Sequence, residues 1–221
     1  NPEAFFTGYV AWRTLVPSNG SHPDSARIYM GPKKHVVSYP IRGGKLINLV
    51  LVEERRGWVE ESWFKEGHVD DLRAIFSSFK GDLSDLLATV EKTNIWGLFR
   101  HPVAKIWSKD AVVLLGDAAH PTLPFMAQGA NIAIEDAWVL AQSLSLSENM
   151  LIGLLNYQAK RLPRVQRIVA EANKNAWKYH LAFPPFRWLA HNAMRSASRF
   201  MPRQMAQRFD WIYNHDVTIQ E

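Results

Sequence analysis

The sequence predicts an α+β fold, in which a mostly antiparallel or mixed β-sheet is followed by long helices. Runs rich in β-branched and aromatic residues, each bounded by turn residues, fill much of residues 5–54. Apolar residues then recur at three- and four-residue steps from residue 132 onward, which is typical of helices. The 221 residues are 47% hydrophobic, which is enough to form the core of one large domain or two small ones.

The first part of the chain is expected to form the sheet. Its first strand, residues 5–16, ends at Pro17 and the turn residues that follow. Arg42, Gly43 and Gly44 join two later strands in a pattern typical of a hairpin. The run 45–52 is largely apolar on both faces, so we expect the sheet to be covered on both sides. The other expected strands span residues 26–30, 36–41 and 46–54.

The segment after the sheet is expected to connect it to the centre of the sequence. The charged residues 53–66 predict a sheet edge and a connecting loop. Helical spacing follows over residues 69–79 and 83–89, and Asp70 and Asp71 lie in the first turn, where the helix dipole favours acids. We assign these helices no chemistry.

The centre of the sequence carries the pattern that points to a ligand. Val112–Leu115 is a short, continuous apolar run, which indicates a buried strand. It stops at Gly116, and the acid Asp117 follows directly. In open α/β sheets, ligands bind at the carboxyl ends of the strands. A carboxylate there can accept hydrogen bonds from the hydroxyls of a ribose or ribityl chain.

A helix is expected after the proline-containing loop 121–127, with Asn131 as its N-cap residue. The segment 128–131 would then present free backbone N–H groups and the positive end of the helix dipole. Gly129 would allow a ligand to approach the backbone closely. Such an arrangement favours an anion or an electron-rich carbonyl edge.

Farther along, residues 151–178 have the pattern of a long amphipathic helix with Pro163 as a kink. Pro184 and Pro185 are expected to end that helical stretch, and residues 188–200 to form a second one. These helices are expected to be structural.

The motif GDAAHP, followed by a proline loop, QGAN and AIEDA, resembles the second flavin-contacting motif of the FAD-dependent aromatic-ring monooxygenases. The resemblance is strongest to the salicylate-hydroxylase-like branch. The segments GYVAWR and YPIRGGKLINLV extend it into the substrate domain of that family. One departure is visible, because many members have a second glycine before the glutamine, where this chain has Ala127.

The resemblance implies a role for each matching position. Asp117 would hold the ribityl chain of FAD, Pro124 would lie beside the flavin ring, and three backbone amides would face the pyrimidine edge. The implied cofactor-binding residues are Gly116, Asp117, Pro124, Gly129, Ala130 and Asn131.

The resemblance also implies two domains. Residues 1–107 would form a substrate-binding β-sheet domain with covering helices. Residues 108–221 would form the C-terminal part of the FAD-binding domain and a helical tail. The chain starts at Asn1 and has no G-x-G-x-x-G turn after a strand, which the family carries upstream, so we expect a C-terminal portion that is inactive by itself.

The function implied is hydroxylation of a small aromatic substrate, salicylate-like and carboxylated, by molecular oxygen. FAD would be the cofactor and NADH or NADPH the co-substrate, and the family reaction passes through a flavin C4a-hydroperoxide. No catalytic acid or base is expected, because the cofactor carries the chemistry. Two alternatives stay open: a related flavoprotein epoxidase or oxidase, and a non-enzymatic binding module on a flavoprotein scaffold.

Four residues are candidates for the substrate pocket. Arg13 could pair with a substrate carboxylate through its guanidinium, or it could hold a loop. Tyr39 and Asn48 could face a ligand or be ordinary sheet residues. His120 could relay a proton beside a flavin, or it could shape its loop.

Composition excludes several other classes of function. The absence of cysteine excludes disulfides and thiolate metal sites, and the scattered histidines lack metal-ligand spacing. No apolar run reaches the roughly 18 to 20 residues of a membrane helix. The net charge of +5 comes from basic residues interspersed with apolar ones, which favours a solvated helical face over a nucleic-acid partner. We expect a cytoplasmic protein and leave open whether it is a homodimer.

Overall fold

The computed structural model describes residues 4–57, 65–175 and 179–219, which form two compact units. The sheet unit comprises Phe5–Phe99 and Trp177–Phe183. The helical unit comprises Asn1–Ala4, Arg100–Ala176 and Pro184–Glu221. The sheet unit changes to the helical unit between Phe99 and Arg100, a few residues before the domain boundary predicted at residue 107. The return of a short segment to the sheet unit was not predicted.

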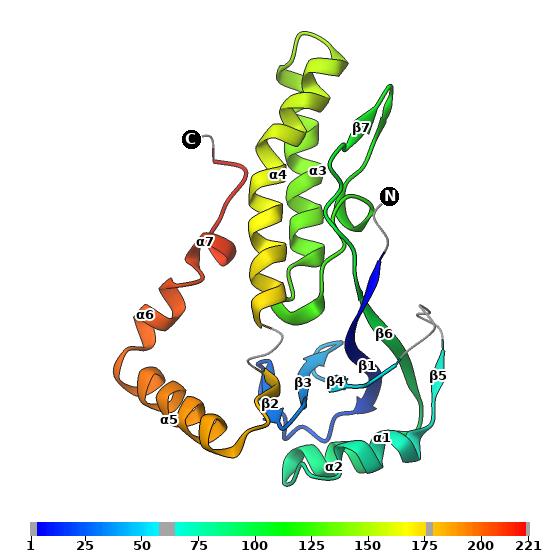
Figure 1. The fold of residues 1–221 in the computed structure, drawn as a ribbon, viewed down its shortest axis with the longest axis vertical. Coiled ribbons are helices and arrows are strands. Elements are labelled where there is room, and N and C mark those ends of the chain that lie inside the picture. The colour runs from blue at the N-terminus through cyan, green and yellow to red at the C-terminus, as the bar shows by residue number, and fades with distance from the viewer. Residues whose placement is uncertain (1–3, 58–64, 176–178, 220–221) are drawn as a thin grey trace. The chain divides into compact units, whose positions relative to one another are not determined.

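The sheet unit contains a six-stranded sheet with the strand order β2-β3-β4-β1-β6-β5 (Figure 1). The pairs β1–β4, β3–β4, β2–β3 and β5–β6 are antiparallel, which confirms the predicted fold class. Between β4 and β5, the predicted connecting loop falls partly on residues 58–64, which lie outside the described residues. The strands are β1 (Phe5–Pro17), β2 (Arg27–Gly31), β3 (Lys34–Ile41), β4 (Leu46–Glu54), β5 (Glu66–Gly67) and β6 (Thr93–Arg100).

The predicted hairpin joins β3 and β4. Arg42, Gly43 and Gly44 all have positive φ angles, of 52°, 65° and 80°. Because a left-handed backbone is costly for most residues, the two glycines make this turn possible. The hairpin fixes the register in which Tyr39 of β3 lies opposite Asn48 of β4.

The core of the sheet unit lies between one face of the sheet and the helices α1 (Val69–Phe76) and α2 (Asp82–Ala88). Leu49 of β4 and Phe76 of α1 both belong to this apolar cluster. Asn48 and Val52 point to the opposite face of β4 and are also buried, at 1% exposure each. Both faces of β4 are therefore buried there, but Leu15 of β1, opposite Asn48 on the same face, is 47% exposed, so the predicted cover of both faces holds for β4 and does not extend over β1.

A short segment after α4 belongs to the sheet unit. The ring nitrogens His180 Nε2 and His35 Nδ1 are 2.6 Å apart, and both histidines are buried. The backbone N–H of Lys33 donates to the carbonyl of His180 at 3.3 Å. These contacts attach a late part of the sequence to β3.

The helical unit is built around α3 (Gly129–Leu146) and α4 (Met150–Asn175), which pack side by side (Figure 1). The predicted kink residue Pro163 lies inside α4, and the helix continues through it. The buried positions of α3 are Ile132, Asp136, Val139 and Ser143. Two polar side chains therefore belong to the face that a local pattern would assign to apolar residues only.

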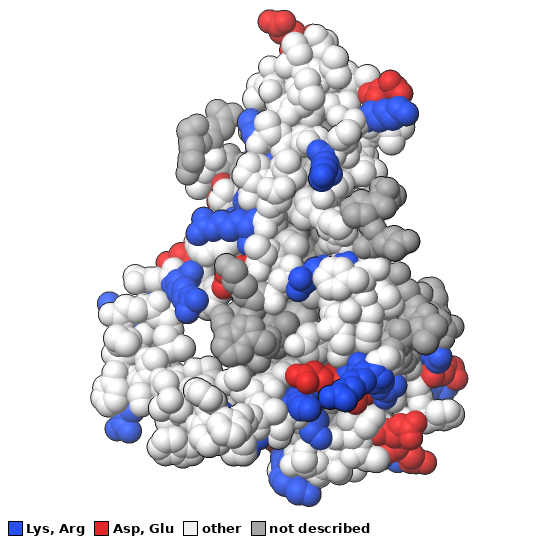
Figure 2. Space-filling view, in the orientation of Figure 1, with Lys and Arg blue, Asp and Glu red and all other residues white. Residues whose placement is uncertain are grey.

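Three further helices follow, α5 (Pro184–Phe200), α6 (Pro202–Gln207) and α7 (Asp210–Tyr213). The prediction that Pro184 and Pro185 end the first helical stretch and that the second begins at residue 188 was wrong, because α4 is described to Asn175 and α5 begins at Pro184. A proline fits the first turn of a helix, where its missing N–H would have no intrahelical partner. On the face drawn in Figure 2, Lys and Arg are spread over many places, and in the lower part several of them lie beside Asp and Glu.

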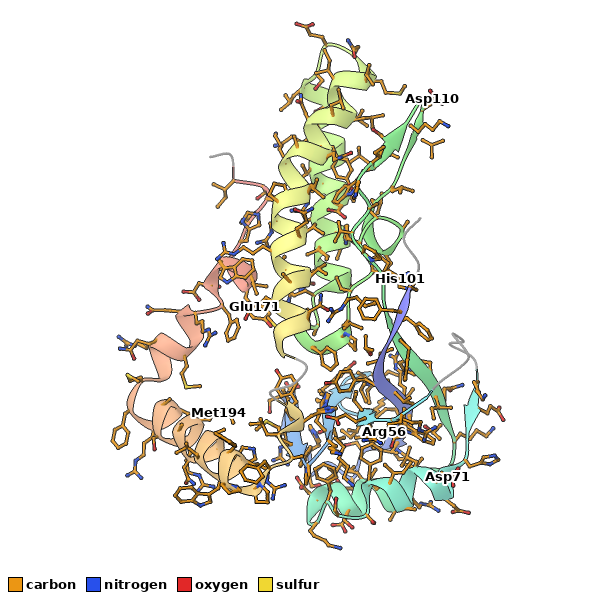
Figure 3. The ribbon with its side chains drawn as sticks, in the orientation of Figure 1. Arg56, Asp71, His101, Asp110, Glu171 and Met194 are labelled. Carbon is orange, nitrogen blue, oxygen red and sulfur yellow. The ribbon has the colours of Figure 1, made fainter. Side chains whose placement is uncertain are left out.

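The prediction of a buried strand over Val112–Leu115 was wrong, because the strand is shorter and is not buried. Only Val112–Val113 is a strand, β8, and it pairs with β7 (Ser108–Lys109) in a hairpin whose tip is Asp110 (Figure 3). The side chain of Val112 is 67% exposed. Among the described residues β8 has one neighbouring strand, and the positive φ of Gly116 turns the chain away directly afterwards.

In the described parts of the chain, we find no helix that combines the length and the apolar character required to cross a bilayer.

Candidate functional site

The loop 116–120 turns sharply and leaves Asp117 on the surface. Gly116 has a φ of +56°, and a Cβ atom there would lie 3.0 Å from the Cβ of Ala133. The N–H groups of Ala119 and His120 both donate to the carbonyl of Gly116, at 2.9 Å each. Asp117 is exposed, and no described residue donates a hydrogen bond to its carboxylate. The loop therefore presents a surface carboxylate that no described residue bonds.

The start of α3 supplies backbone N–H donors from which no described residue accepts. The first intrahelical hydrogen bond runs from the N–H of Ile132 to the carbonyl of Gln128, at 3.0 Å. The N–H groups of Gly129, Ala130 and Asn131 therefore precede the helical ladder. The prediction of Asn131 as N-cap was wrong, because Gln128 occupies that position and Asn131 lies in the first turn. The donors predicted from the QGAN motif are nevertheless present.

The approach to α3 explains this earlier start. A short 3₁₀ helix (Pro124–Met126) ends at Ala127, whose φ of 51° is left-handed. This backbone turn lets the helix begin at Gly129 without a capping side chain. Ala127 stands where many members of the resembled family have glycine, which adopts this conformation at lower cost.

The carboxylate and the helix start lie next to each other. A Cβ atom on Gly129 would be 3.1 Å from Thr122 Oγ1 and 3.9 Å from Asp117 Oδ1. Pro124, Ala130 and Asn131 are all exposed, as is Asp117. Of the predicted cofactor-binding residues, only Gly116 is buried. The structure thus brings together acceptors on Asp117 and donors on α3.

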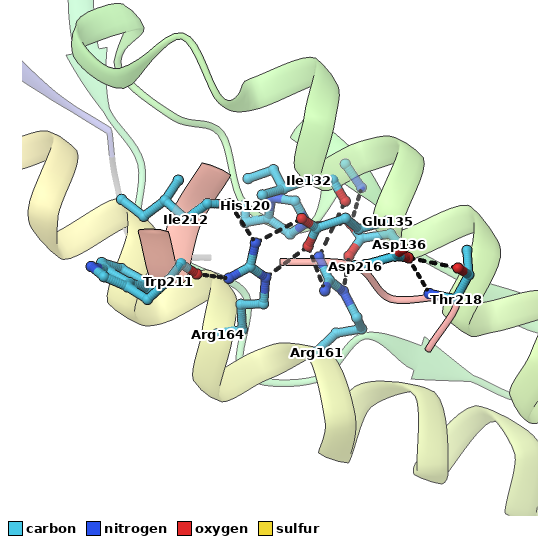
Figure 4. A network of polar contacts seen from close by, with 11 residues as sticks. His120, Ile132, Glu135, Asp136, Arg161, Arg164, Trp211, Ile212, Asp216 and Thr218 are labelled. Carbon is cyan, nitrogen blue, oxygen red and sulfur yellow. Dashed lines mark hydrogen bonds and ion pairs between the residues drawn. The ribbon is translucent and has the colours of Figure 1, made fainter. Parts of the chain in front are cut away.

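A buried network of charges lies beneath the loop (Figure 4). The Asp136 carboxylate accepts hydrogen bonds from the N–H of Gly116 at 3.0 Å, from His120 Nε2 at 2.5 Å and from Arg161 Nε at 2.7 Å. Burial by itself would raise the pKa of Asp136, but the hydrogen bonds from His120, Arg161 and Gly116 outweigh it, and the pKa is lowered. Asp136 is therefore an ionised carboxylate at neutral pH.

The network continues from α3 to α4 and the C-terminal segment. Glu135 accepts from Arg161 Nη1 at 2.7 Å and from two nitrogens of Arg164, at 2.8 and 2.7 Å. Burial would raise the pKa of Glu135, yet the two arginines lower it. Arg164 Nη1 also donates to the carbonyl of Trp211 at 2.7 Å. Residues 116–120, α3, α4 and α7 are thus joined by charged hydrogen bonds.

These charged residues were not predicted from the sequence. The sequence feature that could have indicated them is their helical spacing, which places them on the same helix face as buried apolar residues. Arg161 lies four residues after Tyr157 and four before Val165, and both of those side chains are fully buried. A charge at such a position requires a buried partner of opposite charge.

His120 lies inside the helical unit. Its side chain has 0% exposure, and its ring packs against Trp107 with the ring centroids 5.3 Å apart. Because the Asp136 carboxylate only accepts, the proton of this contact is on His120 Nε2. This placement supports the role of shaping the loop and gives no support to contact with a substrate.

The other three substrate candidates share one face of the sheet. Asn48 lies opposite Tyr39 of β3 and opposite Leu15 of β1, two residues from Arg13. Arg13 Nε donates to Asn48 Oδ1 at 3.2 Å. Asn48 Nδ2 is buried without a hydrogen-bond partner among the described residues. Arg13 is exposed, and no described residue bonds its terminal guanidinium nitrogens.

Several known proteins are similar to this chain over most of its length. A family model described as FAD binding domain matches residues 17–172. The chain is 32% identical over 218 residues to a 3-amino-4-hydroxybenzoate 2-monooxygenase of Streptomyces platensis, covering 96% of this chain and 53% of the relative. It is 35% identical over 187 residues to a 3-hydroxybenzoate 6-hydroxylase of Klebsiella oxytoca, covering 80% and 45%. The chain therefore spans about half the length of these curated relatives.

Solved structures show the same fold. A salicylate hydroxylase in a substrate complex matches with a TM-score of 0.79 at 23% identity, covering 99% of this chain and 56% of that one. Klebsiella pneumoniae HpxO, complexed with FAD and uric acid, matches with a TM-score of 0.75 at 25% identity, covering 90% and 52%. With the loop 116–120 and the start of α3 as described, the chain belongs to the FAD binding domain family and, within it, to the FAD-dependent aromatic-ring monooxygenases.

Proposed function

We propose that the whole protein containing this chain is a FAD-dependent monooxygenase that hydroxylates a small aromatic substrate bearing a carboxylate. The observation that carries this proposal is the exposed carboxylate of Asp117, which has no described partner and lies beside the free amides of α3. Two curated relatives support it, because their names describe oxygenation of aromatic carboxylates.

The residues at this site fit FAD. Asp117 would accept hydrogen bonds from the ribityl hydroxyls. The N–H groups of Gly129, Ala130 and Asn131 would donate to the pyrimidine edge, where the positive end of the α3 dipole favours an electron-rich group. Pro124 would border the ring. When bound, FAD would supply electron transfer from NADH or NADPH and the activation of molecular oxygen.

The sheet unit would bind the substrate, and the helical unit would bind the flavin. Arg13 has terminal guanidinium nitrogens without described partners, and these could pair with a substrate carboxylate in a bidentate manner. Asn48 Nδ2 is a buried donor that lacks an acceptor among the described residues. Since an unpaired buried donor is costly, a ligand oxygen there would be stabilised. Tyr39 would line the same face.

FAD titration of the whole protein, followed by flavin fluorescence, tests the role of Asp117. Asp117→Ala should weaken FAD binding by roughly 10- to 100-fold, because it removes the acceptor of charge-assisted hydrogen bonds. Asp117→Asn retains one acceptor oxygen and should have a smaller effect. An unchanged dissociation constant for Asp117→Ala would exclude this role.

Oxygen uptake with reduced nicotinamide and a series of hydroxybenzoates tests the reaction. Arg13→Gln should raise the KM for a carboxylated substrate by roughly tenfold or more, and should change the KM for the matching benzamide much less. Equal changes for both substrates would contradict pairing with the carboxylate. Product analysis completes the test, since oxygen uptake without a hydroxylated product would favour an oxidase.

A further inference from the structure

One carboxylate closes the loop 116–120 at both ends. Asp136 belongs to α3, but its Oδ2 atom receives the N–H of Gly116, where the loop begins, and Nε2 of His120, where it ends. Its Oδ1 atom receives Arg161 Nε from α4. The side chain of Asp136 has 0% exposure. The loop is therefore fixed to the helix pair at two points by a single buried group (Figure 4).

Asp117 depends on this arrangement because its own side chain has no described partner. Its place is set by the backbone on either side, where the N–H groups of Ala119 and His120 donate to the Gly116 carbonyl and the Ala119 carbonyl accepts from the N–H of Ala104 at 2.8 Å. Without Asp136, the Gly116 N–H would be buried without an acceptor, which is costly. Opening of the loop would then become more favourable in free energy, because it would let the Gly116 N–H bond to water.

The negative charge of Asp136, as well as the position of its oxygen atoms, is needed to hold the loop. A buried carboxylate loses solvation, and this loss must be offset by strong hydrogen bonds and an opposite charge. Arg161 supplies the charge, and the contact from His120 is short, as charge-assisted hydrogen bonds are. An uncharged amide at position 136 would weaken these contacts and would present N–H groups toward other donors.

We propose that Asp136 is the positioning residue of the flavin-binding loop: by holding Gly116 and His120, it sets where Asp117 offers its carboxylate to the ribityl chain of FAD. This inference rests on the proposed function. Asp136 does not contact FAD in this account and acts through Asp117.

Amide hydrogen exchange in the whole protein without FAD tests the first half of the proposal. In Asp136→Asn, the amide protons of Ala119 and His120 should exchange roughly tenfold faster or more, because the loop opens locally. Glu135→Gln is the matched control, since it removes a charge from the same helix and network without touching the loop. Unchanged exchange in Asp136→Asn, or the same increase in both variants, would overturn the proposal.

A second variant covers the case in which Asp136→Asn does not fold. His120→Phe keeps a ring against Trp107 and removes only the contact with Asp136. It should raise exchange at the same two amides by a smaller factor. Exchange identical to that of the unmodified protein would count against the proposal.

A double-mutant cycle on the FAD dissociation constant tests the second half. Asp136→Asn should weaken FAD binding by roughly tenfold. It should have no further effect when Asp117 is already Ala, because Asp136 acts through that side chain. Equal weakening in both backgrounds would show that Asp136 acts by another route and would overturn the proposal.

The two experiments separate this inference from the proposed function. If Asp117→Ala binds FAD normally while Asp136→Asn accelerates loop exchange, the flavin assignment of Asp117 is what fails. If Asp117→Ala binds FAD weakly while loop exchange is unchanged in Asp136→Asn, the positioning role of Asp136 is what fails.

Discussion

The two units hold their candidate ligand-binding residues in different ways. In the sheet unit, Arg13, Tyr39 and Asn48 occupy three neighbouring strands, so the register of the sheet determines their spacing. In the helical unit, Asp117 stands on a loop whose ends are fastened by the buried carboxylate Asp136. The regular spacing of the strands therefore positions the three residues of the sheet unit, whereas charged hydrogen bonds position Asp117. The second solution should be more sensitive to a single substitution.

Removal of Arg161 should have the largest effect on stability. Arg161→Met would leave the buried carboxylates Asp136 and Glu135 short of positive charge, and should lower the free energy of unfolding by about 3–5 kcal/mol. The control is Arg27→Met in the sheet unit, where Arg27 pairs with Asp82 at the exposed surface. Chemical denaturation should show little change for that variant. Equal losses in the two variants would contradict the difference between buried and exposed pairs.

Mild acid should weaken the sheet unit before the helical unit. Burial, together with the charge of His180, lowers the pKa of His35 to about 3, and burial lowers the pKa of His180 to about 4. Both histidines are neutral when folded and take up protons when unfolded below about pH 6.5. Their contribution to stability is therefore complete above that pH and is lost as the pH falls toward 4. Asp136 and Glu135 in the helical unit have lowered pKa values and lose theirs only in stronger acid.

Denaturation curves at pH 7.5 and 5.5 would measure this effect. The unmodified protein should lose about 1 kcal/mol for each buried histidine over that range. His180→Gln should lose about half as much, because one titrating group is removed. An equal pH dependence in both proteins would exclude the histidine pair as its source. Glu54 Oε1 lies 3.5 Å from His180 Nδ1, so Glu54→Gln is a useful second control.

The smallest expected effect concerns Ala127, whose φ of 51° is left-handed. Ala127→Gly should relieve about 1–2 kcal/mol of local backbone cost. Because glycine also gives the unfolded chain about 0.5–1 kcal/mol of extra freedom, the net gain should be about 0–1.5 kcal/mol. Ala137→Gly, at an exposed position within α3, should instead destabilise the protein. If both substitutions changed the free energy of unfolding in the same direction, the inference of backbone strain at Ala127 would be contradicted.

The sequence predicted the sheet well because its signals are local. The β-branched runs and the turn at Arg42, Gly43 and Gly44 depend on neighbouring residues, so the strands and the hairpin could be located. The candidate flavin-binding residues were predicted from a motif of fixed spacing. Cap preference did not place the start of α3, because its N-cap residue Gln128 makes no side-chain cap hydrogen bond.

Features that depend on distant partners could not be predicted. An apolar run such as Val112–Leu115 does not reveal how many strands flank it, and β8 has one described neighbour. The pairing of Asp136 with Arg161 joins positions 25 residues apart on different helices. Neither helix shows by its own periodicity that the other provides an opposite charge.

The contact between His35 and His180 has a consequence for synthesis on the ribosome. It joins positions 145 residues apart, and all of α3 and α4 lies between them. Bringing such distant residues together costs chain entropy, and it cannot occur before both have left the exit tunnel. During synthesis, the contact between His35 and His180 therefore cannot form until α3 and α4 have been synthesised. A gene divided after Phe99 would yield a first product that cannot form this contact.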